Sequence, residues 1–258
     1  MGVAVPSSIQ ARKDLDLLST VYDETRQPLD TETVGNLLAY LSEHGWTSVL
    51  EVGVGTGRIA EPLVAHGVRV VGIDASREML EHAARKGIPH LVRGVAHHLP
   101  FPDRKFDVAL FVHVLHILDD VSAALREAAR VSRSGVLAIL DTPNPRSADV
   151  PSELTPRDVV RKVLTDAGYP DILRAGPRPK EREILLAHPP TETRILSERT
   201  VTEPASKPLD TIAKRAYRNV LRIPPEVLDR AVRAAREQIG DQTVTYHRRE
   251  MVVWWARV

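Results

Sequence analysis

Apolar residues along the chain follow two alternating patterns. Short runs rich in valine, isoleucine and leucine are typical of buried strands, and longer segments with an apolar residue every three or four positions are typical of amphipathic helices. The first helix is expected to begin after Asp30 or Thr31 and to end at Gly45, because these residue types favour helix starts and ends. The patterns predict strands at 48–52, 68–73, 90–94, 106–112, 135–141, 191–202 and 243–255, and further helices at about 58–66, 76–86, 120–132, 156–167, 208–220 and 225–239.

The regular alternation of strand and helix between residues 48 and 141 predicts an α/β fold. Its parallel sheet would be covered by helices on both faces. In open sheets of this kind, ligands bind outside the carboxyl ends of the strands, where the strand order reverses. After Asp141 the run Thr-Pro-Asn-Pro interrupts the pattern, so the chain is expected to leave the regular core there.

A glycine-rich motif follows the first predicted strand. Residues 49–57 read Val-Leu-Glu-Val-Gly-Val-Gly-Thr-Gly. Glycines have no Cβ, so backbone N–H groups at the start of the following helix can approach a ligand closely. The second strand ends at Asp74, whose carboxylate can accept hydrogen bonds from both hydroxyls of a ribose. The two features together predict a site for a cofactor of the nucleotide type.

The glycine spacing distinguishes between two classes of cofactor. Dinucleotide-binding loops follow the pattern G-x-G-x-x-G, whereas here glycines stand at every second position and Arg58 occupies the place of the third glycine. Glu51 adds a negative charge beside the loop, which would repel a pyrophosphate and attract an ammonium group. S-adenosylmethionine carries an ammonium group, a ribose and an adenine but no phosphate, so it fits this pattern better than a dinucleotide.

The segments Glu51-Val-Gly-Val-Gly-Thr-Gly57 and Gly72-Ile-Asp-Ala-Ser76 resemble those of the Rossmann-like (class I) family of S-adenosylmethionine-dependent methyltransferases. The resemblance is carried by motifs over residues 20–141 and only by architecture beyond them. It implies a doubly wound, mostly parallel seven-stranded sheet whose last two strands form an antiparallel hairpin, with a helical cap inserted before the last strand. The domains expected from it are an N-terminal arm over the cofactor site (1–30), an α/β core (31–202), a helical substrate cap (203–241) and the last strand of the sheet (242–258).

The resemblance also assigns residues to the cofactor. Glu51 and the glycine backbone would hold the methionine end, Asp74 the ribose, and the loop 94–103 the adenine. In that loop Val95 stands where the family commonly has an acid, so recognition of adenine would depend on Ala96 and His97. The segment Tyr-Asp-Glu-Thr-Arg at 22–26 resembles one that folds over the methionine end of the cofactor in this family. The alternative is that these are ordinary surface residues with no contact to the cofactor. The expected cofactor site comprises Tyr22, Arg26, Glu51, Gly53, Gly55, Gly57, Asp74, Ala75, Met79, Ala96, His97 and Val112.

Two histidines are candidates for chemistry on the acceptor. His113 is the first polar residue after the fourth strand, and His116 follows three positions later. In the family this segment lies beside the transferring methyl group, and a histidine there can take a proton at neutral pH. The alternative is a structural histidine bonded to the backbone. No carboxylate or cysteine motif accompanies the His-x-x-His pair, so we expect no metal site.

Composition limits the possible partners. The 258 residues carry 35 basic and 34 acidic side chains and no cysteine, which excludes disulfides and thiolate zinc sites and gives no basic surplus for nucleic acid. No apolar stretch is long enough to span a membrane and no signal-peptide core is present, so we expect a cytoplasmic monomer or homodimer that binds neither nucleic acid nor membrane.

The sequence therefore predicts an S-adenosylmethionine-dependent methyltransferase that acts by in-line displacement on an oxygen, nitrogen or carbon atom of a small molecule and leaves S-adenosylhomocysteine. The Asn/Asp-Pro-Pro-Tyr/Phe turn that many nucleic-acid and protein amino-group methyltransferases carry after the fourth strand is replaced here by His113-Val-Leu-His116. Two alternatives remain open: a non-catalytic module that binds S-adenosylmethionine, and a dinucleotide-dependent oxidoreductase.

Overall fold

The computed structural model describes residues 24–25, 30–142, 155–170, 172–173 and 179–256. It divides into two compact units. The core unit contains Gln27–Thr142, Pro177–Glu198 and Arg249–Val258, and the helical unit contains Met1–Arg26, Pro143–Gly176 and Arg199–Arg248. The two longest strands, β6 and β7, contribute residues to both units. The boundaries of the arm, core and cap that the family resemblance implies stay a prediction.

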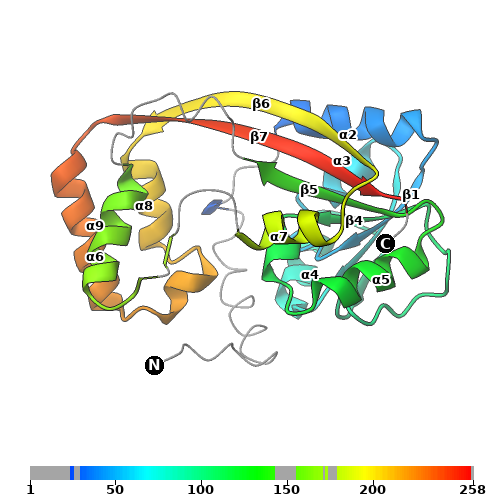
Figure 1. Ribbon diagram of the computed structural model, residues 1–258, viewed down its shortest axis with the longest axis horizontal. Helices are drawn as coiled ribbons and strands as arrows, with labels where there is room; N and C mark the ends of the chain where they lie inside the picture. Colours follow the sequence, from blue (N-terminus) through cyan, green and yellow to red (C-terminus); the bar gives the residue numbers. More distant parts are fainter. Residues whose placement is uncertain (1–23, 26–29, 143–154, 171, 174–178, 257–258) are drawn as a thin grey trace. The chain divides into compact units, whose positions relative to one another are not determined.

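The sheet has the strand order β3-β2-β1-β4-β5-β7-β6, and Figure 1 labels five of these strands, β1, β4, β5, β6 and β7. The first five strands in the chain pair in parallel, and β7 pairs antiparallel with β5. The order reverses between β1 and β4, which is where open sheets of this class bind ligands. This confirms the predicted doubly wound, mostly parallel architecture. The strands are β1 (Ser48–Val52), β2 (Arg69–Asp74), β3 (Leu91–Arg93), β4 (Val108–Val112), β5 (Val136–Thr142), β6 (Glu192–Pro204) and β7 (Thr243–Trp255).

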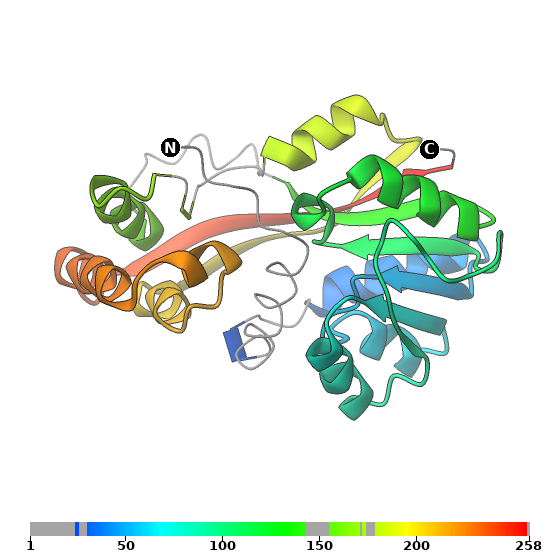
Figure 2. The same cartoon turned by 90° about the horizontal axis from the view of Figure 1, so that it is seen from below.

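Both faces of the sheet are buried in the core unit. Neighbouring residues of β1 point to opposite faces: Val49 joins one apolar cluster and Leu50 the other, and both are fully buried. Helices α2, α3 and α4 pack on the Val49 face, while α5 and α7 pack on the Leu50 face (Figure 2). The helices are α2 (Thr31–Glu43), α3 (Ala60–Ala65), α4 (Arg77–Arg85), α5 (Val121–Val131) and α7 (Pro179–Ala187).

Side-chain caps fix where three of these helices begin. Asp30 accepts a hydrogen bond from the backbone of Thr33, Ser76 from that of Met79, and Asp120 from that of Ala123. Each cap satisfies a backbone N–H group that has no partner within the helix. Ser76 and Asp120 stand just beyond β2 and just beyond the segment that follows β4, so both helices start from the carboxyl edge of the sheet.

The helical unit has an apolar core of its own. Val160 of α6 (Pro156–Asp166), Ile212 of α8 (Ser206–Ala213) and Ala231 of α9 (Pro225–Ile239) are fully buried in one cluster. The short 3-10 helix η3 (Arg218–Arg222) contributes Val220 to the same cluster. Helix α6 therefore packs with the helices that precede the last strand.

One helix prediction is wrong, and one helix was missed. The single helix expected at 208–220 is wrong, because α8 ends at Ala213 and η3 begins only at Arg218. Between them Arg215 has a φ of 56°, a left-handed conformation that a right-handed helix cannot continue through. Its guanidinium donates hydrogen bonds to the carbonyl groups of Leu221 and Ile223, which holds this turn closed. Helix α7 was not predicted, because prolines dominate the preceding sequence.

Among the residues that the structure describes, every helix is too short or too polar to cross a lipid bilayer.

Candidate functional site

The glycine loop after β1 adopts a conformation that needs its glycines. Gly53, Gly55 and Gly57 all have positive φ angles, of 77°, 56° and 81°. A Cβ atom on Gly53 would lie 2.7 Å from the side chain of Val114, and one on Gly57 would lie 2.1 Å from that of Ile88. At Gly55 a Cβ would meet nothing within 4 Å, so that side of the loop is open to a ligand.

Asp74 joins the end of β2 to this loop. One carboxylate oxygen accepts a hydrogen bond from the backbone N–H of Gly55 at 2.9 Å, and the other accepts one from the backbone N–H of Ser76 at 2.9 Å. The neighbouring Met79 is 2% exposed at the start of α4, and the carbonyl of Ala75 accepts a hydrogen bond from Arg93. Asp74 therefore lies beside the glycine loop, as the motif predicted.

Glu51 is a buried carboxyl group at the base of the loop. Its side chain belongs to a residue only 2% exposed, and burial is the main cause that raises its pKa to about 8. The negative charge of Asp74 raises the pKa further, while the backbone N–H of Ala60 and the charge of Arg58 lower it. Within the described part of the chain, its Oε2 atom has no hydrogen-bond partner. An ammonium group would supply the partner and charge that this oxygen lacks.

The predicted adenine loop makes a tight turn. The backbone N–H of His98 donates to the carbonyl of Val95, so Ala96 and His97 lie at the tip of the turn. Beyond the turn, two side chains of α5 hold the backbone. Glu127 accepts a hydrogen bond from the N–H of Leu99, and Arg130 donates to the carbonyls of Leu99 and Phe101.

These two anchoring residues also form an ion pair. Arg130 Nε lies 2.8 Å from Glu127 Oε1, and this bond is the main cause that lowers the pKa of Glu127 to about 2. The guanidinium also contacts Asp103 at 2.8 Å, at the end of the loop. No signal in the sequence singles out Glu127 or Arg130, because they are a turn apart on a helix whose polar face resembles that of any surface helix.

His113 follows Val112, the last residue of β4, and has a φ of 53°. Its Nδ1 atom lies 3.9 Å from Asp141 Oδ2 in β5, and its Nε2 atom lies 4.0 Å from Glu250 Oε1 in β7. Asp141 and Glu250 are direct partners across the antiparallel pair of strands. No sequence motif announces these two carboxylates, because both come from strands distant in sequence from His113.

His116 has a different acidic partner. It lies in the 3-10 helix η1 (Leu115–Ile117), and its Nδ1 atom is 3.4 Å from Oε1 of the buried Glu181 in α7. The two histidines thus face different carboxylates: His113 faces residues of β5 and β7, and His116 faces Glu181 of α7. The roles expected for both remain predictions. Tyr22 and Arg26 lie outside the described residues.

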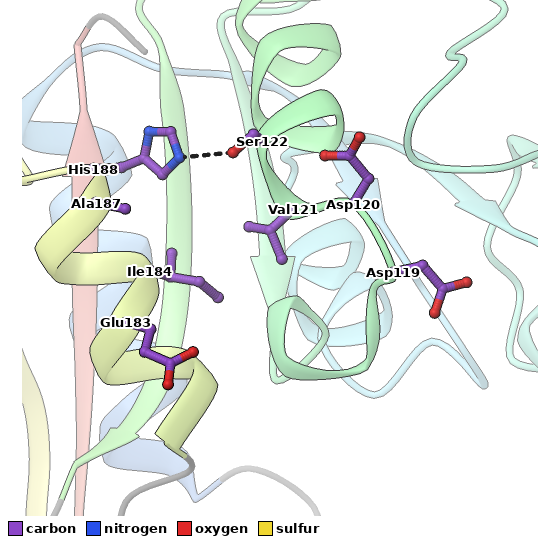
Figure 3. Close-up of a pocket in the computed structure, with 8 residues that line it drawn as sticks. All are labelled: Asp119, Asp120, Val121, Ser122, Glu183, Ile184, Ala187 and His188. Carbon is purple, nitrogen blue, oxygen red and sulfur yellow. Dashed lines mark hydrogen bonds between the residues drawn. The ribbon is translucent and has the colours of Figure 1, made fainter. Parts of the chain in front are cut away.

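A hollow of about 430 Å³ lies between α5 and α7, on the face of the sheet that carries Leu50 (Figure 3). Ser122 and His188 face each other across it, with 3.0 Å between the hydroxyl oxygen and Nε2. It contains no residue of the predicted site. Its lining consists of Asp119, Asp120, Val121, Ser122, Glu183, Ile184, Ala187 and His188.

Part of the core that contains the glycine loop is similar to proteins of a known family. Residues 50–140 match the family described as "Methyltransferase domain". A phosphatidylethanolamine N-methyltransferase of Cereibacter sphaeroides is 39% identical over 94 residues, which are 34% of this chain and 46% of that protein. A demethylmenaquinone methyltransferase of Thermobifida fusca is 36% identical over 128 residues, 46% of this chain and 52% of that protein. The chain thus matches about half the length of these curated relatives.

Solved structures share the fold over nearly the whole chain. YjhP of E. coli superposes with a TM-score of 0.54 at 15% identity and covers 94% of this chain and 99% of its own. A cyclase named SpnF superposes with a TM-score of 0.55 at 17% identity and covers 98% of both chains. At these identities the likeness concerns the fold alone.

Proposed function

We propose that the protein transfers a methyl group from S-adenosylmethionine to an oxygen, nitrogen or carbon atom of a small molecule, because residues 50–140 match the methyltransferase domain and the sheet has the order predicted for it. The observation that carries the proposal is Glu51, a buried carboxyl group with one oxygen lacking a hydrogen-bond partner among the described residues. It stands two residues before the glycine loop, in which a Cβ atom on Gly53 or Gly57 would clash with a neighbouring side chain.

The residues around the loop fit the parts of this cofactor. Glu51 would bind the ammonium group, the backbone from Gly53 to Gly57 the rest of the methionine end, and Asp74 the ribose hydroxyls. Met79 and the turn at Ala96 and His97 would flank the adenine. When bound, S-adenosylmethionine supplies a methyl group that its positively charged sulfur makes reactive. The absence of a G-x-G-x-x-G pattern favours it over a dinucleotide.

His113 is the side chain best placed to act on the acceptor's proton. It stands at the carboxyl end of β4, next to the point where the strand order reverses. A hydroxyl or amine acceptor must lose a proton when it is methylated, and an imidazole can take it at neutral pH. Asp141 and Glu250 would stabilise the resulting positive charge and orient the ring.

A small-molecule acceptor is supported by the relatives that match this chain. The names of two of them specify phosphatidylethanolamine and demethylmenaquinone as their acceptors, and neither is a protein or nucleic acid. The near equality of basic and acidic residues, 35 and 34, also gives no general attraction for nucleic acid.

Calorimetric titration with S-adenosylmethionine, S-adenosylhomocysteine and NADH tests the cofactor. We expect binding of the first two and none of the third, whereas binding of NADH alone would contradict the proposal. Activity is then tested by following S-adenosylhomocysteine during incubation with a panel of small hydroxyl, amine and acid acceptors. Cofactor binding without product for any acceptor class would favour a non-catalytic binding module.

A further inference from the structure

We propose that His113, Asp141 and Glu250 form a binding site for one divalent metal ion at the carboxyl edge of β4 and β5. Each residue offers one ligand atom, and the three atoms lie within 4.8 Å of one another. All three belong to the core unit, so the site does not depend on how the two units are arranged.

The register of the sheet brings the two carboxylates together. Asp141 pairs with Glu250 in the antiparallel ladder between β5 and β7, as Ile139 pairs with Val252 two residues away. Alternate residues of a strand share a face, so both carboxylates lie on the face that carries Ile139 and Val252 in its apolar cluster. The turn after β4, with its left-handed residue at His113, sets the imidazole against both carboxylates.

Electrostatics favours a cation at this point. Like charges directly opposite each other on neighbouring strands destabilise a sheet, and Glu250 is only 4% exposed, so its charge is poorly solvated. Protonation of His113 would supply one positive charge against two negative ones. A divalent ion supplies two and leaves the imidazole neutral, which is the form that binds metals.

The separations are compatible with a shared ion. Metal–ligand bonds to histidine nitrogen and carboxylate oxygen are about 2.0–2.2 Å, so two ligands of one ion can stand up to roughly 4.4 Å apart. His113 Nε2 and Glu250 Oε1 are 4.0 Å apart, within this limit. Asp141 Oδ2 lies 3.9 Å from the other ring nitrogen, Nδ1, and the three ligand atoms lie within 4.8 Å of one another, so the 53% exposed side chain of Asp141 has to turn slightly for one ion to reach all three residues. One imidazole with two carboxylates suits manganese, iron, cobalt or zinc, and three protein ligands leave coordination positions open.

The consequence for the reaction rests on the proposed function. An ion held here would bind an acceptor that presents a hydroxyl oxygen beside a second oxygen, and would make that hydroxyl more acidic. Its proton would pass to solvent, an oxygen lone pair would form the new bond to the methyl carbon, and the electron pair of the broken carbon–sulfur bond would remain on sulfur. His113 would then act as a ligand, and the ion would do the work assigned above to a base.

Manganese binding tests the site without any assay of methyl transfer. The full chain is stripped with a chelator, desalted and titrated with Mn²⁺, and free Mn²⁺ is read by electron paramagnetic resonance. We expect one ion per chain, and affinity weakened by about 10- to 100-fold or more in Asp141→Asn and Glu250→Gln, since loss of a ligand should cost at least as much as loss of a supporting residue. Asp119→Asn, an exposed aspartate on the other side of the sheet, is the matched control and should bind as the unaltered chain does.

The possible outcomes of the titration are distinct. No bound Mn²⁺, or equal affinity in all the variants, would overturn the metal site whatever the activity of the protein. Saturable binding that both ligand variants weaken, and the control does not, would support it. If Glu250→Gln failed to fold, as judged by circular dichroism, Asp141→Asn would decide alone, because its side chain is half exposed. Mn²⁺ binding without methyl transfer would count against the proposed function and leave the metal site standing.

Discussion

Replacing Glu51 with glutamine should remove a pH-dependent loss of stability from the folded protein. The pKa of this buried carboxyl group is raised to about 8 from an ordinary value of 4.5. A raised carboxyl pKa means that the folded state resists ionisation, so the folded protein binds more protons than the unfolded one between the two values. Stability contributed by the neutral form is therefore complete below pH 4.5 and is lost as the pH rises toward and beyond 8.

The size of this effect follows from the pKa values of the folded and unfolded states. A tenfold change in an ionisation constant corresponds to about 1.36 kcal/mol. For pKa values of 4.5 and about 8, the linkage relation then gives a loss of about 3 kcal/mol between pH 5.5 and pH 8. Glutamine has nearly the same shape and does not titrate. The free energy of unfolding of Glu51→Gln should thus decline less over this range than that of the unaltered chain, by about 3 kcal/mol.

Urea unfolding followed by circular dichroism at pH 5.5, 6.5, 7.25 and 8 measures this difference, with the slope against urea checked for constancy. Glu61→Gln, an exposed glutamate on α3, is the control and should follow the unaltered chain. Other titrating groups contribute nearly equally to all three proteins, apart from Asp74, whose charge interacts with that of Glu51. Parallel pH profiles for Glu51→Gln and the unaltered chain would refute the raised pKa and with it the burial argument.

Three further substitutions test the site. Asp74→Ala should weaken S-adenosylmethionine binding by about 1–3 kcal/mol, because a charged hydrogen-bond acceptor is lost; unchanged affinity by calorimetry would contradict the ribose assignment. His113→Ala should lower the turnover number far more than cofactor affinity, and an equal fall in both, measured by steady-state kinetics beside calorimetry, would place it with the structural residues. Gly57→Ala should destabilise the fold by about 1–3 kcal/mol in urea unfolding, since φ is 81° and the new Cβ would lie 2.1 Å from Ile88; full stability would mean that the loop relaxes easily.

The features that the sequence predicted well depend on neighbours along the chain. The strands up to β5 follow from runs of apolar residues, and the loop conformation follows from glycines at 53, 55 and 57. The placement of Asp74 beside the loop follows from the end of the next strand, because parallel neighbours present their carboxyl ends at one edge. Each of these inferences depends only on the pattern of residues within one strand or loop, or within one strand-helix-strand unit.

The features that the sequence did not predict depend on contacts between distant segments. Glu250 lies 137 positions after His113, and its approach is set by the register of β7 against β5, which no local pattern specifies. The same holds for Glu181, which α7 brings to His116. The break at Arg215 depends on a side chain that bonds to carbonyls six and eight residues later, so periodicity alone extended the helix through it.

The way α5 holds the loop 94–103, where we propose that adenine binds, has a consequence for how this loop can change during evolution. Glu127 and Arg130 grip the loop through backbone groups of Leu99 and Phe101, so the shape of the loop does not depend on which side chains stand at its tip. Positions 95–98 can therefore accept substitutions while the turn keeps its path. Val95, at a place where the resemblance to the methyltransferase family implies an acid, is one such position. A lineage could in this way retune its affinity for adenine by single mutations without first acquiring compensating ones.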